Sequence, residues 1–398
     1  MLRITTANAF ATSIDNLQTR QNELSEAQAQ LTSGKRVLRA SDDPTAAARA
    51  ERSRALVQRA ESTQRAVDAS RNAMTLTEAA LGNAGDLLQQ ARDLVVQAGN
   101  ASYTDAERSD LADQIAAIRT QLMGVANRTD GAGGYVFSGQ GSAKAPFLDQ
   151  AGGVAFTGAG GVVKAASAEP LPLTLDGGSV WLSATSGNGV FETSQGTSTT
   201  AWMDAGRVTD PSLITGAAYS LQFSVSGGQT TYSILKDGQA TSVTGAAYVA
   251  GQSIEIDGMA VNVSGSPANG DAMEITPASN DLSAFDALDQ IVKDLKTPLR
   301  SNAQTTQTVQ NGLRDLDAVR NHMQSARSMA GETLNRIDSV EGRVADLKLF
   351  GESTRSAAED LDMVQAISDF QNRQTGYEAA LQTYSSMQRM SMFDYINV

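Results

Sequence analysis

The sequence lacks cysteine and contains a single histidine, His322. The absence of cysteine excludes disulfide bonds, cysteine-ligated zinc, iron–sulfur clusters and thiol nucleophiles. A single histidine excludes a metal site built from several histidines. Aromatic residues make up only 5% of the 398 residues. The core must therefore consist mainly of aliphatic side chains and alanine.

Long apolar runs and an excess of positive charge are also missing. No apolar run reaches the roughly 18 residues that a membrane-spanning helix needs. The net charge is −13, which disfavours general affinity for the nucleic-acid backbone. The first residues lack the continuous apolar segment of a secretory signal. We therefore expect no nucleic-acid or membrane partner. If the protein is exported, we expect a route that does not use a secretory signal.

Composition divides the chain into three parts. Of the 35 glycines, 25 lie between residues 131 and 280, together with six of the eight prolines. This part is also rich in Ser, Thr and Val, which suits short strands and turns, whereas the flanks are rich in helix formers. The sequence predicts an α+β protein. Its N- and C-terminal segments form a long antiparallel helical bundle or coiled coil, with an inserted antiparallel β-rich domain.

From these differences in composition we expect three domains. Segments 1–40 and 355–398 form terminal coiled-coil assembly segments. Segments 41–140 and 281–354 form a helical rod domain, and residues 141–280 form an inserted, β-rich outer domain.

Heptad repeats mark the N-terminal helices. The first stripe comprises Phe10, Ile14, Leu17, Leu24 and Leu31, and Ser33-Gly34 ends that helix. A second helix begins near Asp43-Pro44 and runs to about Ala98. Its stripe comprises Val67, Met74, Leu81, Leu88 and Val95. A third helix begins with a Thr104–Glu107 capping box.

The C-terminal part is predicted to be helical from residue 280 almost to its end, with a break near Thr297-Pro298. Its last segment has a 4-3-4-3-4-3 spacing at Met363, Ile367, Phe370, Gln374, Tyr377, Leu381 and Tyr384. This spacing is typical of a coiled coil, and also of the core face of a helical bundle. Because both ends of the sequence carry such a stripe, we expect the stripes to pack on each other or on another chain.

Two β-hairpins are predicted in the middle part, because Gly-Gly and Asp-Gly pairs favour tight turns. Their strands are Tyr219–Val225 with Thr230–Leu235, and Ser253–Ile256 with Met259–Val263. A further strand is expected at Ser179–Ser183 and a loop at 193–200.

No catalytic or ligand-binding constellation is present. The glycines at 131–134 and 139–141 lack dinucleotide-binding spacing. Asp204, Asp237 and Asp257 could in principle supply a glycosidase pair, but such carboxylates are usually turn residues. We expect no enzymatic activity, no cofactor and no metal, and an exposed or bundle-side position for His322.

Several segments resemble the flagellin superfamily. They include Arg3-Ile4-Thr5-Thr6, and Leu31-Thr32-Ser33-Gly34-Lys35-Arg36-Val37 followed by Ser41-Asp42-Asp43-Pro44-Thr45-Ala46-Ala47. Three features resemble the hook-associated branch of that superfamily more than flagellin itself: Asp42-Asp43-Pro44, residues 135–139 and the tail 390–396. Segment 265–271 also resembles a segment common in the hook-associated branch. The resemblance covers about residues 1–140 and 281–398, and only segment 265–271 of the insertion.

This resemblance implies a structural component of the bacterial flagellum that joins hook to filament by self-assembly of its helical termini into a ring. The implied partners are other copies of the chain, the adjacent hook-associated junction protein, flagellin and an export chaperone. The implied route is the flagellar type III channel, leading to the extracellular flagellum.

We expect the apolar residues of the two terminal stripes to form the assembly interface: Phe10, Ile14, Leu17, Leu24, Leu31, Met363, Ile367, Phe370, Tyr377, Leu381 and Tyr384. Of these, Phe370, Tyr377, Leu381 and Tyr384 are the expected chaperone-binding residues. Before assembly, we expect residues 1 to about 40 and about 355–398 to be mobile. The conformational entropy lost when these segments become ordered is offset only when neighbouring subunits bury the apolar stripes.

Two alternatives remain open at this point. Flagellin itself would grow into long filaments alone, whereas a junction protein would not. A surface carbohydrate-active module on helical stalks would need convergent polar groups within 141–280.

Overall fold

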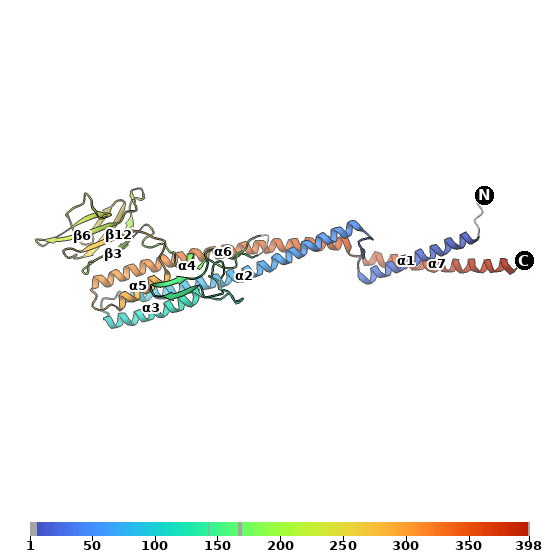
Figure 1. Cartoon of the computed structure of the whole chain (residues 1–398), viewed down its shortest axis with the longest axis horizontal. Coiled ribbons are helices and arrows are strands. Elements are labelled where there is room, and N and C mark those ends of the chain that lie inside the picture. Colours follow the sequence, from blue (N-terminus) through green and yellow to red (C-terminus); the bar gives the residue numbers. More distant parts are fainter. Residues whose placement is uncertain (1–5, 142, 166–168, 397–398) are drawn as a thin grey trace. The chain divides into compact units, whose positions relative to one another are not determined.

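The computed structural model describes residues 6–141, 143–165 and 169–396 (Figure 1). The predicted α+β class is confirmed: long helices at both ends of the chain enclose a β-rich segment in the sequence. The helices are α1 (Thr6–Ser33), α2 (Pro44–Ala98), α3 (Asp105–Ala126), α4 (Gly177–Trp181), α5 (Ala284–Lys296), α6 (Asn302–Glu359) and α7 (Met363–Ile396). The segment Arg3-Ile4-Thr5, which contributes to the family resemblance, lies outside the described residues.

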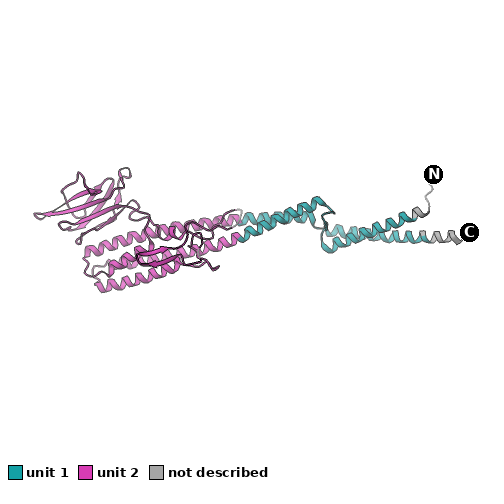
Figure 2. Ribbon diagram, in the orientation of Figure 1, with its two compact units in different colours: residues 1–65, 341–398 teal, residues 66–340 magenta. Residues whose placement is uncertain are grey.

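The chain forms two compact units, coloured separately in Figure 2. Unit 1 comprises Met1–Arg65 and Glu341–Val398, and unit 2 comprises Ala66–Val340. Unit 1 therefore combines the two ends of the sequence, whereas unit 2 is one continuous segment, and α2 and α6 contribute to each unit.

The predicted stripe of α2 lies in the core of unit 2. Val67, Met74, Leu81, Leu88 and Val95 are all buried. Small buried residues accompany them on the same helix at Ser70, Thr77, Ala84 and Ala91. Antiparallel α6 is joined to α2 by the Glu78–Arg327 and Arg92–Asp317 ion pairs, at 2.6 and 2.9 Å. The heptad spacing therefore predicts correctly which side of α2 is buried.

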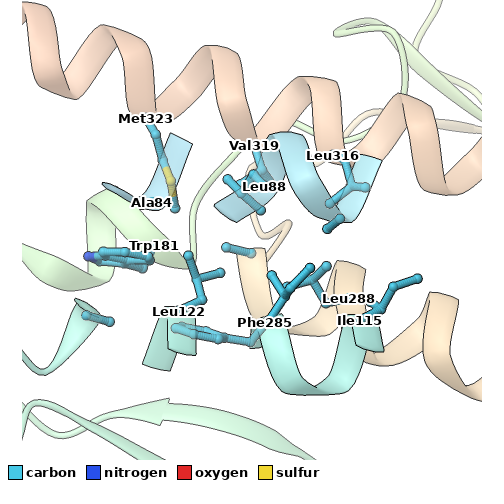
Figure 3. Close-up of a cluster of buried hydrophobic side chains, with 14 of the residues drawn as sticks. Ala84, Leu88, Ile115, Leu122, Trp181, Phe285, Leu288, Leu316, Val319 and Met323 are labelled. Carbon is cyan, nitrogen blue, oxygen red and sulfur yellow. The ribbon is translucent and has the colours of Figure 1, made fainter. Parts of the chain in front are cut away.

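Helices α3 and α5 complete this core (Figure 3). The predicted capping box at the start of α3 is confirmed: Glu107 N–H donates to Thr104 Oγ1 and Thr104 N–H donates to Glu107 Oε2. Trp181 stacks on Phe285 of α5, with ring centroids 5.9 Å apart. This pair belongs to an aromatic cluster of unit 2 that also contains Phe137 and Phe147.

The described residues of the β-rich segment form three antiparallel sheets. Its strands are β1 (Phe147–Gln150), β2 (Gly153–Phe156), β3 (Phe191–Ser194), β4 (Ala201–Met203), β5 (Arg207–Val208), β6 (Tyr219–Ser226), β7 (Gln229–Lys236), β8 (Gln239–Ala240), β9 (Ala246–Ala247), β10 (Ser253–Ile256), β11 (Met259–Gly265) and β12 (Ala272–Pro277), with a 3₁₀ turn at Pro211–Leu213. One sheet has the order β3-β12-β6-β7-β8, with β9 also on β7. A second has β10-β11-β4, with β5 also on β11, and β1 pairs with β2.

Both predicted hairpins are confirmed, as β6–β7 and β10–β11. Gly227 and Gly228 have positive φ at the first turn, and Asp257 and Gly258 have positive φ at the second. The larger sheets share a core of apolar side chains that includes Phe223.

Three sequence-based expectations are wrong. Residues 179–183 do not form a strand, because Asp176 caps a short helix through Ser179 N–H at 3.2 Å. The expected loop at 193–200 begins with the end of β3, which pairs with β12. The C-terminal helix breaks a second time, at residues 360–362, where Leu361 N–H bonds to Gly34 O.

Leu88→Ala should lower the free energy of unfolding of unit 2 by about 2–5 kcal/mol, because a fully buried leucine leaves a cavity. Urea unfolding followed by Trp181 fluorescence measures this change, since Trp181 belongs to the same core. Leu148→Ala, at a side chain that is 46% exposed, is the control and should change stability by less than about 0.5 kcal/mol. Equal effects of the two substitutions would contradict the assignment of this core.

Candidate assembly surface

Helices α1 and α7 pair side by side in unit 1 (Figure 1). The pairing is antiparallel: the Phe10 and Tyr384 rings lie 5.3 Å apart, and Arg373 Nη1 donates to Glu23 O at 3.0 Å. At the other end of the pair, Lys35 forms a β-bridge with Asp360. We call α1 and α7 the terminal helix pair.

Each helix of the terminal pair is covered on one side only. On α1, Ile14, Leu17, Leu24 and Leu31 are half-buried against α7, and on α7 the half-buried positions include Ala366, Phe370, Arg373, Tyr377, Ala380 and Tyr384. Among the side chains that the structure describes on these two helices, only Ala27 is fully buried. Two helices alone therefore leave much of their apolar surface in contact with water.

Part of the predicted α7 stripe points away from α1. Met363 and Ile367 are each 47% exposed and Leu381 is 42% exposed. Val364, which the sequence analysis did not single out, is 83% exposed, and Phe10 of α1 is at 36%. The terminal pair thus has an inner seam, filled by Phe370, Tyr377 and Tyr384 from α7, and a second apolar side without a neighbour among the described residues.

The connections into the terminal pair meet at one place. Gly34 ends α1 with φ +69°, and its N–H donates to Gln30 O at 2.9 Å. Arg36 N–H donates to Glu359 O at 2.8 Å, and Leu361 N–H donates to Gly34 O at 3.0 Å. Residues 34–43 and 358–362, which we call the joint, are therefore tied together by backbone hydrogen bonds.

Glu359 is the central charge of the joint, and only 5% of the residue is exposed. Its carboxylate contacts Lys35 Nζ at 3.3 Å, Arg355 Nε at 3.7 Å, and Arg54 Nη2. A buried carboxylate needs such compensation, because desolvation of an unpaired charge is costly. Sequence reasoning missed this residue, since its partners Lys35 and Arg54 lie more than 300 positions away.

Two adjacent aspartates shape the other side of the joint. Asp42 Oδ2 accepts from Arg39 N–H at 2.7 Å, and Asp43 Oδ1 accepts from Ala46 N–H at 2.9 Å at the start of α2. The Ala46 N–H, with the Arg36 guanidinium, lowers the pKa of Asp43. A lowered folded-state pKa means that this cap stabilises the fold above the unfolded pKa, and that the contribution is lost as pH falls through the folded pKa. The motif at 31–47 therefore has a structural role.

Asp204, Asp237 and Asp257, the aspartates considered as a glycosidase pair, each bind a different partner. Asp204 accepts from Asn262 Nδ2 at 2.7 Å, Asp237 accepts from Ala218 N–H, and Asp257 accepts from Lys236 Nζ at 2.7 Å. Each carboxylate thus forms hydrogen bonds or ion pairs with its own neighbours. His322 lines a cavity of about 610 Å³, and its Nε2 lies 2.8 Å from Ser179 O.

The described residues also bear on metal binding and on membrane insertion. No cluster of three or more acidic or histidine side chains is suited to hold a metal ion. Within the same residues, no helix is long and apolar enough to span a membrane.

Two family models match parts of the chain. Residues 4–142 match the bacterial flagellin N-terminal helical region, and residues 191–277 match the D2-like domain of flagellar hook-associated protein 1. The second match covers the two larger β-sheets, which sequence reasoning left unassigned to any known domain.

The sequence is similar to individual flagellar proteins, one of them over nearly the whole chain. Flagellar hook-associated protein 3 of Escherichia coli is 23% identical over 98% of this chain and 99% of its own length. The Salmonella typhimurium protein of that name is 34% identical, but the match spans 38% of this chain and about half (48%) of the relative. Flagellin of Bacillus subtilis is 28% identical over 32% of this chain and 43% of its own length.

Solved structures share the fold. The crystal structure of flagellar hook-associated protein 3 from Legionella pneumophila has a TM-score of 0.71 at 26% identity, over 76% of this chain and 97% of that one. That of FlgL from Xanthomonas campestris has a TM-score of 0.66 at 27% identity, over 75% and 98%.

Glu359→Gln should loosen the joint while keeping the shape of the side chain. Hydrogen bonds to a charged group contribute about 1.5–3 kcal/mol. The amides of Arg36 and Leu361 should therefore exchange about tenfold faster in hydrogen–deuterium exchange. Glu352→Gln, at an exposed position on the same helix, is the control. Unchanged exchange in the Glu359 variant would mean that this carboxylate does not hold the joint.

Proposed function

Because this chain belongs to the flagellin superfamily, we propose that it is a structural subunit of the bacterial flagellum, joining the hook to the filament. The observation that carries this proposal is similarity to a flagellar hook-associated protein 3 over 98% of the chain. The match of the insertion to a hook-associated domain supports the same role. Flagellin is the less supported alternative, because the quoted match to flagellin covers only 32% of the chain.

The mechanism is assembly of the terminal helix pair. Its outer apolar side, with Met363, Ile367 and Leu381 exposed, is covered when neighbouring subunits pack around it in a ring. Burial of apolar surface contributes roughly 25 cal/mol per Å². That gain offsets the conformational entropy lost when the ends become fixed.

The partners follow from this role. Copies of the chain form the ring. The adjacent hook-associated junction protein lies on one side of this ring, and flagellin lies on the other. The chain is exported through the flagellar type III channel and functions outside the cell. The relatives are structural flagellar proteins, and we assign this chain no enzymatic activity. Segments 1–40 with 355–398 make the assembly domain, 41–140 with 281–354 the rod, and 141–280 the outer domain.

An export chaperone binds α7 before assembly in this scheme. Phe370, Tyr377 and Tyr384 are half-buried against α1, so a chaperone that takes these side chains must separate α7 from α1. Binding by the chaperone and formation of the terminal helix pair therefore exclude each other, which keeps the apolar side chains from aggregating before export.

Deletion of the gene should leave intact hooks without attached filaments and release unpolymerised flagellin into the medium. Electron microscopy of cells and immunoblotting of the medium measure both effects, and a plasmid copy of the gene should reverse them. Cells that retain filaments of normal length after deletion would rule out a junction role. Filaments grown from the purified chain alone would instead favour flagellin.

The double substitution Phe370→Ser and Tyr377→Ser should weaken binding of the flagellar export chaperone from the same bacterium by about tenfold or more, because buried aromatic residues dominate interface energies. Titration calorimetry measures this affinity. Leu148→Ser with Leu213→Ser, both exposed and within the insertion, is the matched control. Equal affinity for both variants would remove α7 as the chaperone site.

A further inference from the structure

The outer side of α6 in unit 1 has an apolar patch with one acidic residue. Leu349 is 68% exposed and Phe350 is 64% exposed. Asp346 is exposed too and lies three and four positions before them, on the same side of the helix. Within the part of the chain that the structure describes, the Asp346 carboxylate has no hydrogen-bond or ion-pair partner. We call Asp346, Leu349 and Phe350 the α6 patch.

The outer side of α2 in unit 1 offers a cation that suits this patch. Arg59 is exposed, and its Nε donates to Ala55 O at 3.2 Å, one turn earlier on the same side of the helix. The described residues provide no carboxylate for its guanidinium. We call Ala55 and Arg59 the α2 site. An aromatic ring and a carboxylate one turn apart attract a guanidinium through cation–π and ion-pair interactions.

The α6 patch and the α2 site lie on opposite sides of the pair formed by α2 and α6, which run side by side in unit 1 (Figure 2). These helices meet at Val57 and Gly351, where the valine methyl groups leave no room for a side chain on the glycine. Arg59 and Leu349 are each two positions from this contact, so their side chains point away from it. The α6 patch therefore cannot reach the α2 site of the same molecule.

The two surfaces stand at the same height along the helix pair. Gly351 is level with Val57, and Lys348 Nζ lies 3.6 Å from Glu61 Oε1. Counted from these contacts along antiparallel helices, Phe350 is level with about position 58 of α2 and Asp346 with about position 62. Arg59 therefore stands between the two levels, within about 6 Å of either along the axis at 1.5 Å per residue.

We propose that the α6 patch of one copy docks on the α2 site of the next copy, with the Arg59 guanidinium between the Phe350 ring and the Asp346 carboxylate. This inference rests on the proposed function, because it assigns a contact between neighbouring subunits of the ring. Since the two surfaces are level, successive copies keep the same height and the same direction. Helix α2 then runs antiparallel to α6 of the neighbour, as it does to its own α6. Such a head-to-tail contact can close into a ring.

A second copy is the occupant that fits both surfaces, because the chain itself carries the complementary cation at the matching height. When one α6 patch is filled, the α2 site on the other side of the same molecule stays open for the next copy. Leu349 and Phe350 supply apolar burial. The exposed ion pair adds little affinity by itself, and its contribution is to fix register and direction.

Charge reversal followed by charge exchange tests this contact in a strain that lacks the natural gene. Asp346→Arg and Arg59→Glu should each lower the fraction of cells with attached filaments by about tenfold, because like charges then face each other. In the chain with both substitutions the two charge changes cancel, so the net charge stays at −13. This double variant restores the ion pair in reversed order and should restore attachment.

Matched controls separate the possible failures. Asp110→Arg and Arg207→Glu make the same charge changes at exposed positions of unit 2 and should leave attachment unchanged. Single reversals that behave like these controls, or a double variant no better than either reversal, would overturn the docking arrangement. Filaments that stay attached without the gene would instead overturn the proposed function, and that result requires no charge variant.

Cross-linking gives a second measurement that leaves the docking charges intact. Because the chain has no cysteine, Ala55→Cys with Ser353→Cys introduces the only two thiols. Ser353 lies three positions after Phe350 on the same side of α6 and is level with about position 55 of α2. A short bis-maleimide added to isolated flagella should join successive copies into a ladder of oligomers on a denaturing gel, whereas either single-cysteine variant should give dimers at most. Flagella that contain the double variant without producing a ladder would contradict the proposal.

Discussion

The incomplete burial of two paired helices is the constraint on which the rest of this structure depends. Among the described residues, α1 and α7 pack on each other, and Ala27 is the single fully buried side chain described on them. In contrast, Leu81, Leu88 and Val95 of the α2 stripe lie in a core that also contains side chains of α3, α5 and α6. The same heptad spacing therefore produces a closed core in unit 2 and a half-covered helix pair in unit 1.

The joint connects this requirement to the sequence motif at 31–47. Gly34 adopts the left-handed conformation that ends α1, and Asp43 caps the start of α2. Glu359 forms ion pairs with both Lys35 and Arg54. The motif therefore positions the terminal pair on the end of α2 and α6 within unit 1. The motif at 31–47 therefore has a positioning role, because it determines where the exposed apolar side of the terminal helix pair lies within unit 1.

Local patterns predicted much of the fold, and tertiary contacts account for what they missed. Helix α2 and both hairpins were predictable because heptad spacing and Gly-Gly or Asp-Gly turns are encoded within short segments. Helix α4 was not, since it lies against a distant segment, where Gly177 is so close to the Phe137 carbonyl that a side chain would clash. Similarly, both terminal stripes could be found from spacing, but spacing alone did not reveal that Phe370 would face α1 while Ile367 would stay exposed. Two partners of Glu359, Lys35 and Arg54, are too distant in sequence to leave a local signal.

Amide exchange measured in both assembly states tests the central claim most directly. The account predicts rapid exchange along α1 and α7 in the free chain, because a two-helix pair with one half-buried seam opens easily. It predicts strong protection of the same amides in isolated flagella. Equal, strong protection of both helices in the free chain and in the assembled structure would contradict it, because the terminal pair would then be complete without its neighbours.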